Sequence, residues 1–202
     1  MPRRLIQLFT GLVLYGISDS MLLLAGLGVD PWDVLHQGLS RRTGLSLGTV
    51  TIVVGALVLL LWVPLRQRPG IGTVSNVFVV GIAVDVSLAL MPEVQALLPR
   101  AGLLALGIAA NALASAAYIG AGLGPGPRDG LMTGLVGRTG GTVRRVRTAI
   151  EVVVLVAGWL LGGDVGLGTV AYALAIGPLV HPLLPLLTIR PAPPQQEVAE
   201  SV

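Results

Sequence analysis

A stretch of 25 residues occurs twice in this chain of 202 residues, and the two copies lie 96 positions apart. Residues 26–50 and 122–146 align without a gap and share twelve identities, including a Gly-Leu-Gly, a Pro, an Asp and a Leu in the first ten positions. The same offset aligns the Gly-x-Gly-Thr-Val segment at 70–74 with the one at 166–170. A duplication of this length predicts two halves that share one local fold.

The composition of the chain places both halves in a membrane. Hydrophobic residues make up 53% of the chain and charged residues only 11%, whereas soluble domains carry about a quarter charged residues. All 13 basic residues are arginine, and they stand at the ends of apolar segments. This position is typical of topology determinants, so we expect no nucleic-acid partner. The absence of cysteine excludes disulfides and thiolate chemistry.

Six apolar segments approach the roughly 20 residues that cross a bilayer. They are residues 5–25, 46–65, 72–91, 101–122, 147–162 and 166–187. The predicted fold is therefore an all-α polytopic membrane protein with three spans in each half, 1–95 and 96–187. An odd number of spans inserts the second half upside down, which predicts a 3+3 inverted repeat of the kind found in secondary transporters. The tail at 188–202 has too little apolar surface to fold and should be disordered.

The arginines also predict the orientation. Ten of them fall on one side of the predicted membrane, and only Arg41, Arg42 and Arg100 fall on the other. The ten are Arg3, Arg4, Arg66, Arg68, Arg128, Arg138, Arg144, Arg145, Arg147 and Arg190. Because cytoplasmic loops are enriched in arginine, we expect both termini in the cytoplasm and the chain in a bacterial inner membrane.

Each copy of the duplicated segment predicts one short helix. Asp30 is suited to the N-cap, Pro31 to the first helical position and Gly44 to the left-handed C-cap, which gives a helix over 31–43. The second copy gives a helix over 127–139 in the same way. A helix of about 12 residues is about 18 Å long and cannot span a bilayer.

Two interpretations of these short helices stay open. They can lie flat at opposite interfaces, with Asp33 and Asp129 acting only as caps. They can instead re-enter between the halves, so that their N-termini and glycine turns line a polar path. Gly38, at the centre of a shared apolar stripe, would allow close approach by another helix in either case.

Two acidic residues, Asp19 and Asp85, fall inside predicted spans, and both are expected in the outer half of the membrane. Intramembrane acids are costly and point to function, although hydrogen bonding to a neighbouring serine is the alternative. The offset aligns Asp85 with His181, which could take part in proton transfer or have only a structural role. Asn111 is expected to hydrogen-bond between helices, and Trp62 to lie in an aromatic belt.

The candidates for lining a substrate path comprise the acids, the glycine turns and the polar residues of both halves. They are Asp19, Gly26, Gly28, Asp33, Arg42, Asn76, Asp85, Gly122, Gly124, Asp129, Arg138 and His181.

The motif Gly26-Leu-Gly28-x-x-Pro31-x-Asp33-x-Leu35 is followed by Gly38-Leu-Ser40-x-Arg42-x-Gly44 and later by Gly70-x-Gly72-Thr73-x-x-Asn76. This pattern resembles the YczE-like family of bacterial integral membrane proteins, which is more loosely related to the YitT-like proteins. The resemblance covers about residues 5–187 and implies a polytopic inner-membrane protein. The second copy departs from the pattern, with Val136 for Ser40 and Tyr172 for Asn76.

The predicted function is the movement of a small molecule or ion across the membrane. The alternative is a membrane-embedded regulator or assembly factor that docks a cytoplasmic protein through Arg144, Arg145 and Arg147. We found no catalytic constellation or metal-ligand spacing, so we expect neither an enzyme, nor a cofactor, nor a bound metal. The lipid bilayer is the expected partner, and a homo-oligomer stays possible.

Overall fold

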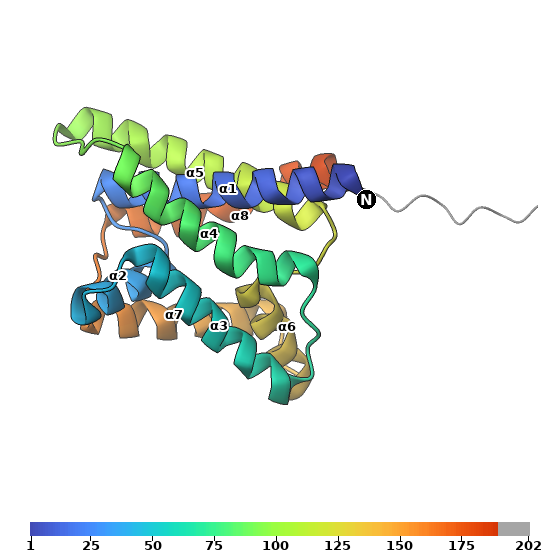
Figure 1. Cartoon of the computed structure of the whole chain (residues 1–202). Helices are drawn as coiled ribbons and strands as arrows, with labels where there is room; N and C mark the ends of the chain where they lie inside the picture. The colour runs from blue at the N-terminus through green and yellow to red at the C-terminus, as the bar shows by residue number, and fades with distance from the viewer. Residues whose placement is uncertain (190–202) are drawn as a thin grey trace, which may run out of the picture.

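The computed structural model describes residues 1–189, and in that range it contains eight α-helices and no strand (Figure 1). The helices are α1 (Pro2–Ala25), α2 (Pro31–Thr43), α3 (Leu47–Leu65), α4 (Ile71–Leu90), α5 (Leu97–Gly120), α6 (Pro127–Thr139), α7 (Val143–Leu160) and α8 (Leu167–Leu187). The predicted disorder of the tail from residue 190 onward lies outside the described residues.

The two short helices, α2 and α6, have the bounds that the capping residues predicted. The Asp30 carboxylate accepts hydrogen bonds from the backbone N–H groups of Trp32 (2.7 Å) and Asp33 (3.0 Å), which satisfies the first turn of α2. Gly44 and Gly140 end the two helices with positive φ angles of 73° and 68°. Local signals therefore fix both ends of these helices.

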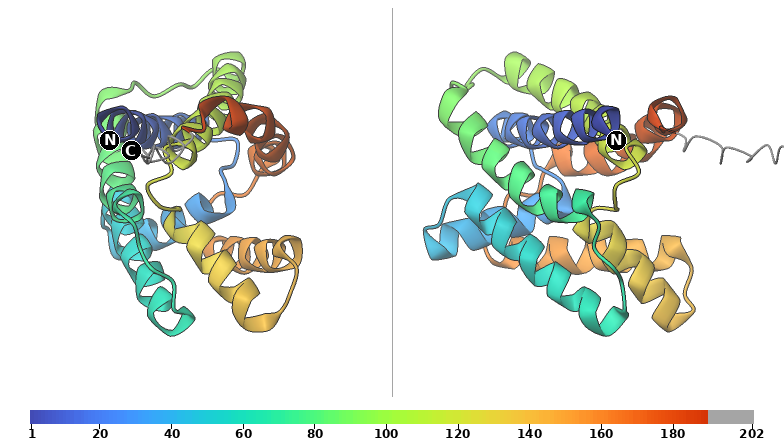
Figure 2. Two further views of the ribbon diagram at one scale, coloured as in Figure 1. Left: turned by 90° about the vertical axis from the view of Figure 1, so that its right-hand side faces the viewer. Right: turned by 45° about the vertical axis from the view of Figure 1, so that its right-hand side comes forward.

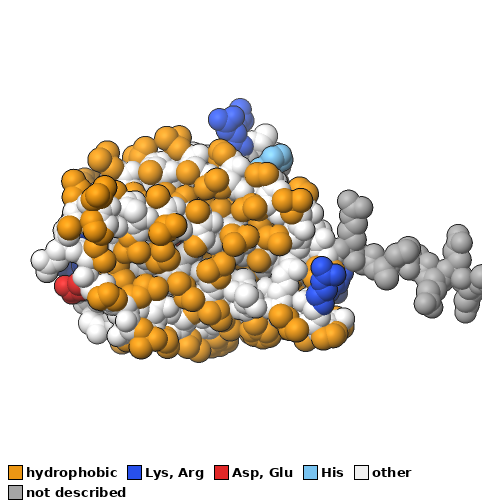
Figure 3. All heavy atoms as spheres, turned by 90° about the horizontal axis from the view of Figure 1, so that it is seen from above, with side chains coloured by type: hydrophobic (Ala, Val, Ile, Leu, Met, Phe, Trp, Pro, Cys, Tyr) orange, Lys and Arg blue, Asp and Glu red, His pale blue; other side chains and the backbone are white. Residues whose placement is uncertain are grey.

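Five helices are long and apolar enough to cross a membrane: α1, α3, α4, α5 and α8. The remaining predicted span corresponds to α7, which has 18 residues but is not in this set. Its first half carries Arg144, Arg145, Arg147 and Glu151. The face seen from above in Figure 3 is largely apolar, and its charged side chains lie at the edges, as expected of a surface in contact with lipid.

The helices form two layers (Figures 1 and 2). In one layer α1 packs against α5 and α4, and α5 packs against α8. In the other layer α2 packs against α7, and α6 packs against α3. The contact between α3 and α4 joins the two layers. Among the described residues, the corresponding pair α7 and α8 shows no extensive contact.

The duplicated glycine motifs lock the two halves of the chain together. The backbone N–H of Gly168 donates to the Leu27 carbonyl (2.7 Å), and the N–H of Gly72 donates to the Leu123 carbonyl (2.8 Å). Gly124 has a φ of 127° and lies so close to Thr73 that an added Cβ would be 2.8 Å from Thr73 Oγ1. The Gly-x-Gly turn of each half thus sits on the Gly-x-Gly-Thr helix start of the other half.

Close packing also joins each short helix to the opposite half. A Cβ on Gly38 of α2 would lie 2.6 Å from the Gly158 carbonyl of α7, so the predicted close approach at Gly38 is confirmed. On α3, the Trp62 ring packs against Gly130 of α6, and its Nε1–H donates to the Pro127 carbonyl (3.1 Å). Trp62 is only 2% exposed, so the prediction that it lies in an aromatic belt is wrong.

Candidate functional site

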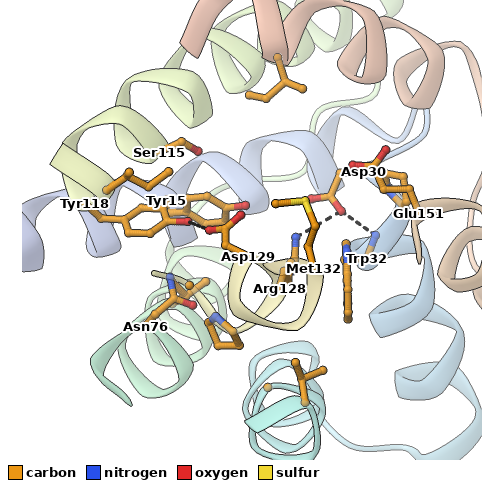
Figure 4. Close-up of a pocket in the computed structure, with 18 of the residues that line it drawn as sticks. Tyr15, Asp30, Trp32, Asn76, Ser115, Tyr118, Arg128, Asp129, Met132 and Glu151 are labelled. Atoms are coloured by element: carbon orange, nitrogen blue, oxygen red, sulfur yellow. Dashed lines mark hydrogen bonds and ion pairs between the residues drawn. The ribbon is translucent and has the colours of Figure 1, made fainter. Parts of the chain in front are cut away.

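The first turns of α2 and α6 lie close to each other (Figure 4). Arg128, near the start of α6, places Nη1 3.6 Å from Asp30 Oδ1 and Nη2 3.9 Å from Asp33 Oδ1. Its guanidinium carbon also lies 5.0 Å from the centre of the Trp32 ring, within the range of a cation–π interaction. The N-termini of two helices from opposite halves therefore share one cluster of charges.

From this meeting point the two helices run toward opposite ends of the molecule (Figure 1). At the outer end of α2, Arg42 Nε donates to the Leu161 carbonyl (3.3 Å), and Arg41 forms an ion pair with Asp164 (2.5 Å). The hydrogen bond with Asp164 raises the pKa of Arg41. At the outer end of α6, Arg138 Nη1 donates to the Pro64 carbonyl (3.1 Å).

Three buried carboxylates converge beside Arg128. Asp19, Asp30 and Asp33 are at most 2% exposed, and each offers an oxygen within 4.8 Å of the oxygens of the other two. The Asn111 amide donates to Asp19 Oδ1 (2.8 Å), and His36 Nδ1 lies 3.1 Å from Asp33 Oδ1. The Oδ2 atoms of Asp30 and Asp33 are buried and have no hydrogen-bond partner within residues 1–189. One arginine thus faces three acids.

A cavity of about 360 Å³ opens next to this cluster. Arg128 and Asp30 line it together with Tyr15, Tyr118 and Tyr172, which come from α1, α5 and α8. The Tyr118 hydroxyl donates to Asp129 Oδ2 (3.1 Å), and the Tyr172 hydroxyl donates to Asn111 Oδ1 (2.8 Å). The wall therefore combines aromatic rings with a few fixed polar groups, as small-molecule sites do.

The structure brings part of the predicted path together. Asn76, Asp129 and His181 line the cavity, and Asp19 and Asp33 belong to the carboxylate cluster beside it. Asn111 hydrogen-bonds between α1, α5 and α8, as predicted.

Other predicted residues lie elsewhere. Asp85, on α4, accepts from Ser46 Oγ (2.6 Å) and from the Gly48 N–H (2.7 Å) and does not line the cavity. It therefore does not share a site with Asp19. Arg42 and Arg138 fix the outer ends of the short helices, as described above.

The four predicted glycines lie in the turns before the short helices. Gly26 accepts a hydrogen bond from Arg100 Nη2 through its carbonyl (2.6 Å), and Gly122 has open space where a Cβ would point. Gly28 and Gly124 form the contacts between halves. None of the four lines the cavity.

Sequence reasoning missed the residue at the centre of the site. Arg128 was placed among the cytoplasmic arginines, but its side chain lies between Asp30, Asp33 and Trp32. The offset of 96 aligns Arg128 with Trp32 and Gly126 with Asp30. These mismatches inside an otherwise repeated motif were the available signal.

The three arginines that were predicted to dock a partner differ in their contacts. Arg144 and Arg145 are exposed on α7. Arg147 instead donates to Glu151 Oε1 (2.9 Å), and both of these residues border the cavity.

Comparison with known proteins adds the family. Residues 2–184 match the model described as "Family of unknown function (DUF6198)". The chain belongs to the DUF6198 family. A protein of Haemophilus influenzae called "Uncharacterized protein" is 36% identical over 190 residues, covering 94% of this chain and 87% of its own length.

Two Bacillus subtilis proteins are also similar to this DUF6198 chain. "Uncharacterized membrane protein YczE" is 32% identical over 179 residues, covering 88% of this chain and 83% of that protein, which confirms the YczE-like resemblance. "Uncharacterized protein YyaS" is 25% identical over 181 residues, covering 88% and 90%. No solved structure matches this DUF6198 chain. The YczE relative and the five apolar helices together indicate a membrane protein.

Proposed function

We propose that this protein is a transporter for a small polar solute and that the solute binds in the cavity between α2 and α6. The observation that carries the proposal is the meeting of two helix N-termini from opposite halves on the wall of one cavity, with Arg128 between them. Secondary transporters place interrupted helices and their N-termini at the substrate site in this way. A volume of about 360 Å³ suits a small metabolite.

The chemistry of the wall favours a solute that carries an anionic group. Arg128 keeps 29% of its side chain exposed, although it lies beside buried acids. The α6 N-terminus has no side-chain cap, whereas Asp30 caps α2. Uncapped N–H groups and a guanidinium together attract carboxylate or phosphate. The three tyrosines can pack against an apolar part of the same solute.

We infer further that residues 1–95 and 96–187 are inverted repeats, with α7 as the sixth span. The four helices of each half follow the offset of 96, and so do the hydrogen bonds of Gly72 and Gly168. The charges of α7 lie in its first half, and exposed Val152, Val156 and Trp159 follow. Its 18 residues are about 27 Å long, close to the thickness of a hydrocarbon core.

A difference between the halves suggests how access alternates. Gly81 of α4 packs against Gly48 of α3, and Asp85 bonds across the same contact. The equivalent glycine of α8, Gly177, has nothing within 4 Å of a Cβ. Exposed Arg147 and His181 border the cavity on this side. We infer that the cavity opens between α7 and α8, and that closing this pair while α3 and α4 separate would expose the opposite side.

A ligand screen tests the proposed function. The purified protein is mixed with small carboxylates, phosphates and amino acids, thermal stabilisation is measured, and each hit is then tested for uptake into proteoliposomes. We expect at least one anionic or zwitterionic hit whose uptake is lost in Arg128→Gln. Arg68→Gln is the matched control, because Arg68 is exposed and lies outside the cavity. A hit that Arg128→Gln still transports at the wild-type rate would contradict this site.

A further inference from the structure

We propose that Asp19, Asp30 and Asp33 form a binding site for a hard cation of the size of Na⁺ or Ca²⁺. The site lies between α1 and the first turn of α2, next to the solute cavity, which Asp30 also lines. The three residues are at most 2% exposed. Asn111 of α5 donates a hydrogen bond to Asp19 of α1, and a backbone N–H of the first turn of α2 donates to Asp30. These contacts hold the carboxylates in position.

The spacing of the oxygens fits one ion. Each of the three carboxylates offers an oxygen within 4.8 Å of the other two. Calcium–oxygen distances are about 2.3–2.6 Å, so oxygens on opposite sides of one ion lie up to about 5 Å apart. The distances between the three oxygens are therefore compatible with all three binding one ion.

The unpartnered oxygens point to a ligand independently of the spacing. Asp30 uses Oδ1 to cap α2 and Asp33 uses Oδ1 to face His36, while the Oδ2 atoms of both are buried without a partner. Buried carboxylate oxygens without partners are costly, and native proteins pair them with donors or metals. Oxygen donors of this kind select hard cations over soft ones.

The charge balance also calls for a cation. Three carboxyl groups cluster beside one guanidinium, and Arg128 stays 3.6 Å from Asp30 and 3.9 Å from Asp33, beyond hydrogen-bond distance. It makes no ion pair with Asp19, whose oxygen is held by the Asn111 amide instead. A cation bound by the three carboxylates would supply positive charge that Arg128 alone does not.

A cation at this site would compete with Arg128 for the same carboxylates. Occupancy would weaken the hold of Asp30 and Asp33 on the guanidinium and leave Arg128 free to bind an anionic solute in the cavity. This coupling rests on the proposed function, whereas the cation site itself does not. Cation binding is therefore measured without any solute.

The test is the thermal stability of the purified protein in detergent at fixed pH and ionic strength. Chloride salts of Na⁺, K⁺, Mg²⁺ and Ca²⁺ are titrated against N-methylglucamine chloride. We expect a saturable rise in Tm with Na⁺ or Ca²⁺, because a ligand that binds only the folded state stabilises it. Comparison of the Na⁺ and Ca²⁺ titrations shows which of these ions the site binds.

Variants separate the site from general salt effects. Asp19→Asn and Asp33→Asn should weaken the apparent affinity by about tenfold or more, while Asn at position 19 can still accept from Asn111. Arg128→Gln should tighten it several-fold, because a competing positive charge is removed. Asp85→Asn, an acid outside the cluster, should retain the wild-type response.

Three results would overturn the proposal. The first is an equal response of the wild-type protein to all salts. The second is a retained cation response in both Asp19→Asn and Asp33→Asn. The third is stabilisation by falling pH alone, which would mean that protons neutralise the cluster. A positive cation response with no transported solute would leave this site intact and count against the proposed function.

Discussion

At the scale of single residues, the main property of the site is that three buried carboxyl groups cluster beside a single guanidinium, that of Arg128. The guanidinium lies near Asp30 and Asp33, packs on Trp32, and remains partly exposed to the cavity. A buried carboxylate that loses its positive neighbour costs free energy, because its charge is then desolvated without compensation. Arg128 is therefore expected to stabilise the fold as well as to bind solute.

Replacing Arg128 by Gln should lower the free energy of unfolding by about 1–3 kcal/mol, since Arg128 is partly exposed and its ion pairs are long. In a chain of this size that corresponds to a fall in Tm of several degrees. Adding Asp33→Asn should recover part of the loss, because it removes one uncompensated charge. Differential scanning fluorimetry in detergent measures both variants, and an equal or lower Tm in the double variant would contradict the account.

Gly124 provides a second prediction at this scale. A side chain there would be strained by its φ of 127° and would lie 2.8 Å from Thr73 Oγ1, so Gly124→Ala should lower Tm. Gly122→Ala is the matched control, because Gly122 also has a positive φ (65°) but has open space around its Cβ position. Unfolding scans should show a clearly larger loss for Gly124→Ala. Equal losses would mean that backbone strain alone, and not the contact between halves, requires glycine at 124.

Single residues could be predicted from the sequence where their partners are local. Asp30 caps α2 by accepting from backbone N–H groups two and three residues ahead, and Gly44 ends the same helix. Both roles could therefore be predicted from the neighbouring sequence. Asp19 pairs with Asn111 across 92 residues, and Arg128 meets Asp30 and Asp33 from the other half of the chain. Only the fold brings such partners together, so the cluster could not be predicted.

At the scale of helices, the duplicated segments explain why α2 and α6 are short and where they end. Caps and glycines fixed their bounds in advance, whereas their packing against α7 and α3 depends on long-range contacts. The sequence also did not predict that α3 packs on α4 while α7 stays apart from α8. Arg144 stands at the position equivalent to Gly48, so a closed α7–α8 contact should be looser than the α3–α4 contact.

This difference between helix pairs predicts two mutually exclusive cross-links. Cysteines at Ser46 and Asp85 should form a disulfide in the state described here, because these side chains are in contact. Cysteines at the equivalent positions, Thr142 and His181, should cross-link only when α7 closes on α8. Gel shift after mild oxidation measures each pair in a chain that has no native cysteine.

The two cross-links should respond oppositely to solute or cation if access alternates between the halves. Conditions that increase the 142–181 cross-link should decrease the 46–85 cross-link. Cross-linking of both pairs to the same extent under all conditions would show that the helices do not exchange positions.

At the scale of the whole molecule, the proposed inverted repeat explains why two similar segments take different roles. Each half contributes one helix that begins at the cavity and ends at an opposite surface. The first half supplies Asp30 and Trp32, and the second supplies Gly126 and Arg128 at the aligned positions. Divergence at the shared site therefore produces one asymmetric cluster from two related parts.

The most direct test of this account is the accessibility of single cysteines along α2 and α6, measured with a membrane-impermeant maleimide applied from either side. Cysteine at Arg42 should be labelled only from outside and cysteine at Arg138 only from the cytoplasm. Cysteine at Met132, which lines the cavity, should be labelled only from the side on which the cavity is open. Labelling of positions 42 and 138 from the same side would contradict the account, because the two short helices would then not run to opposite surfaces.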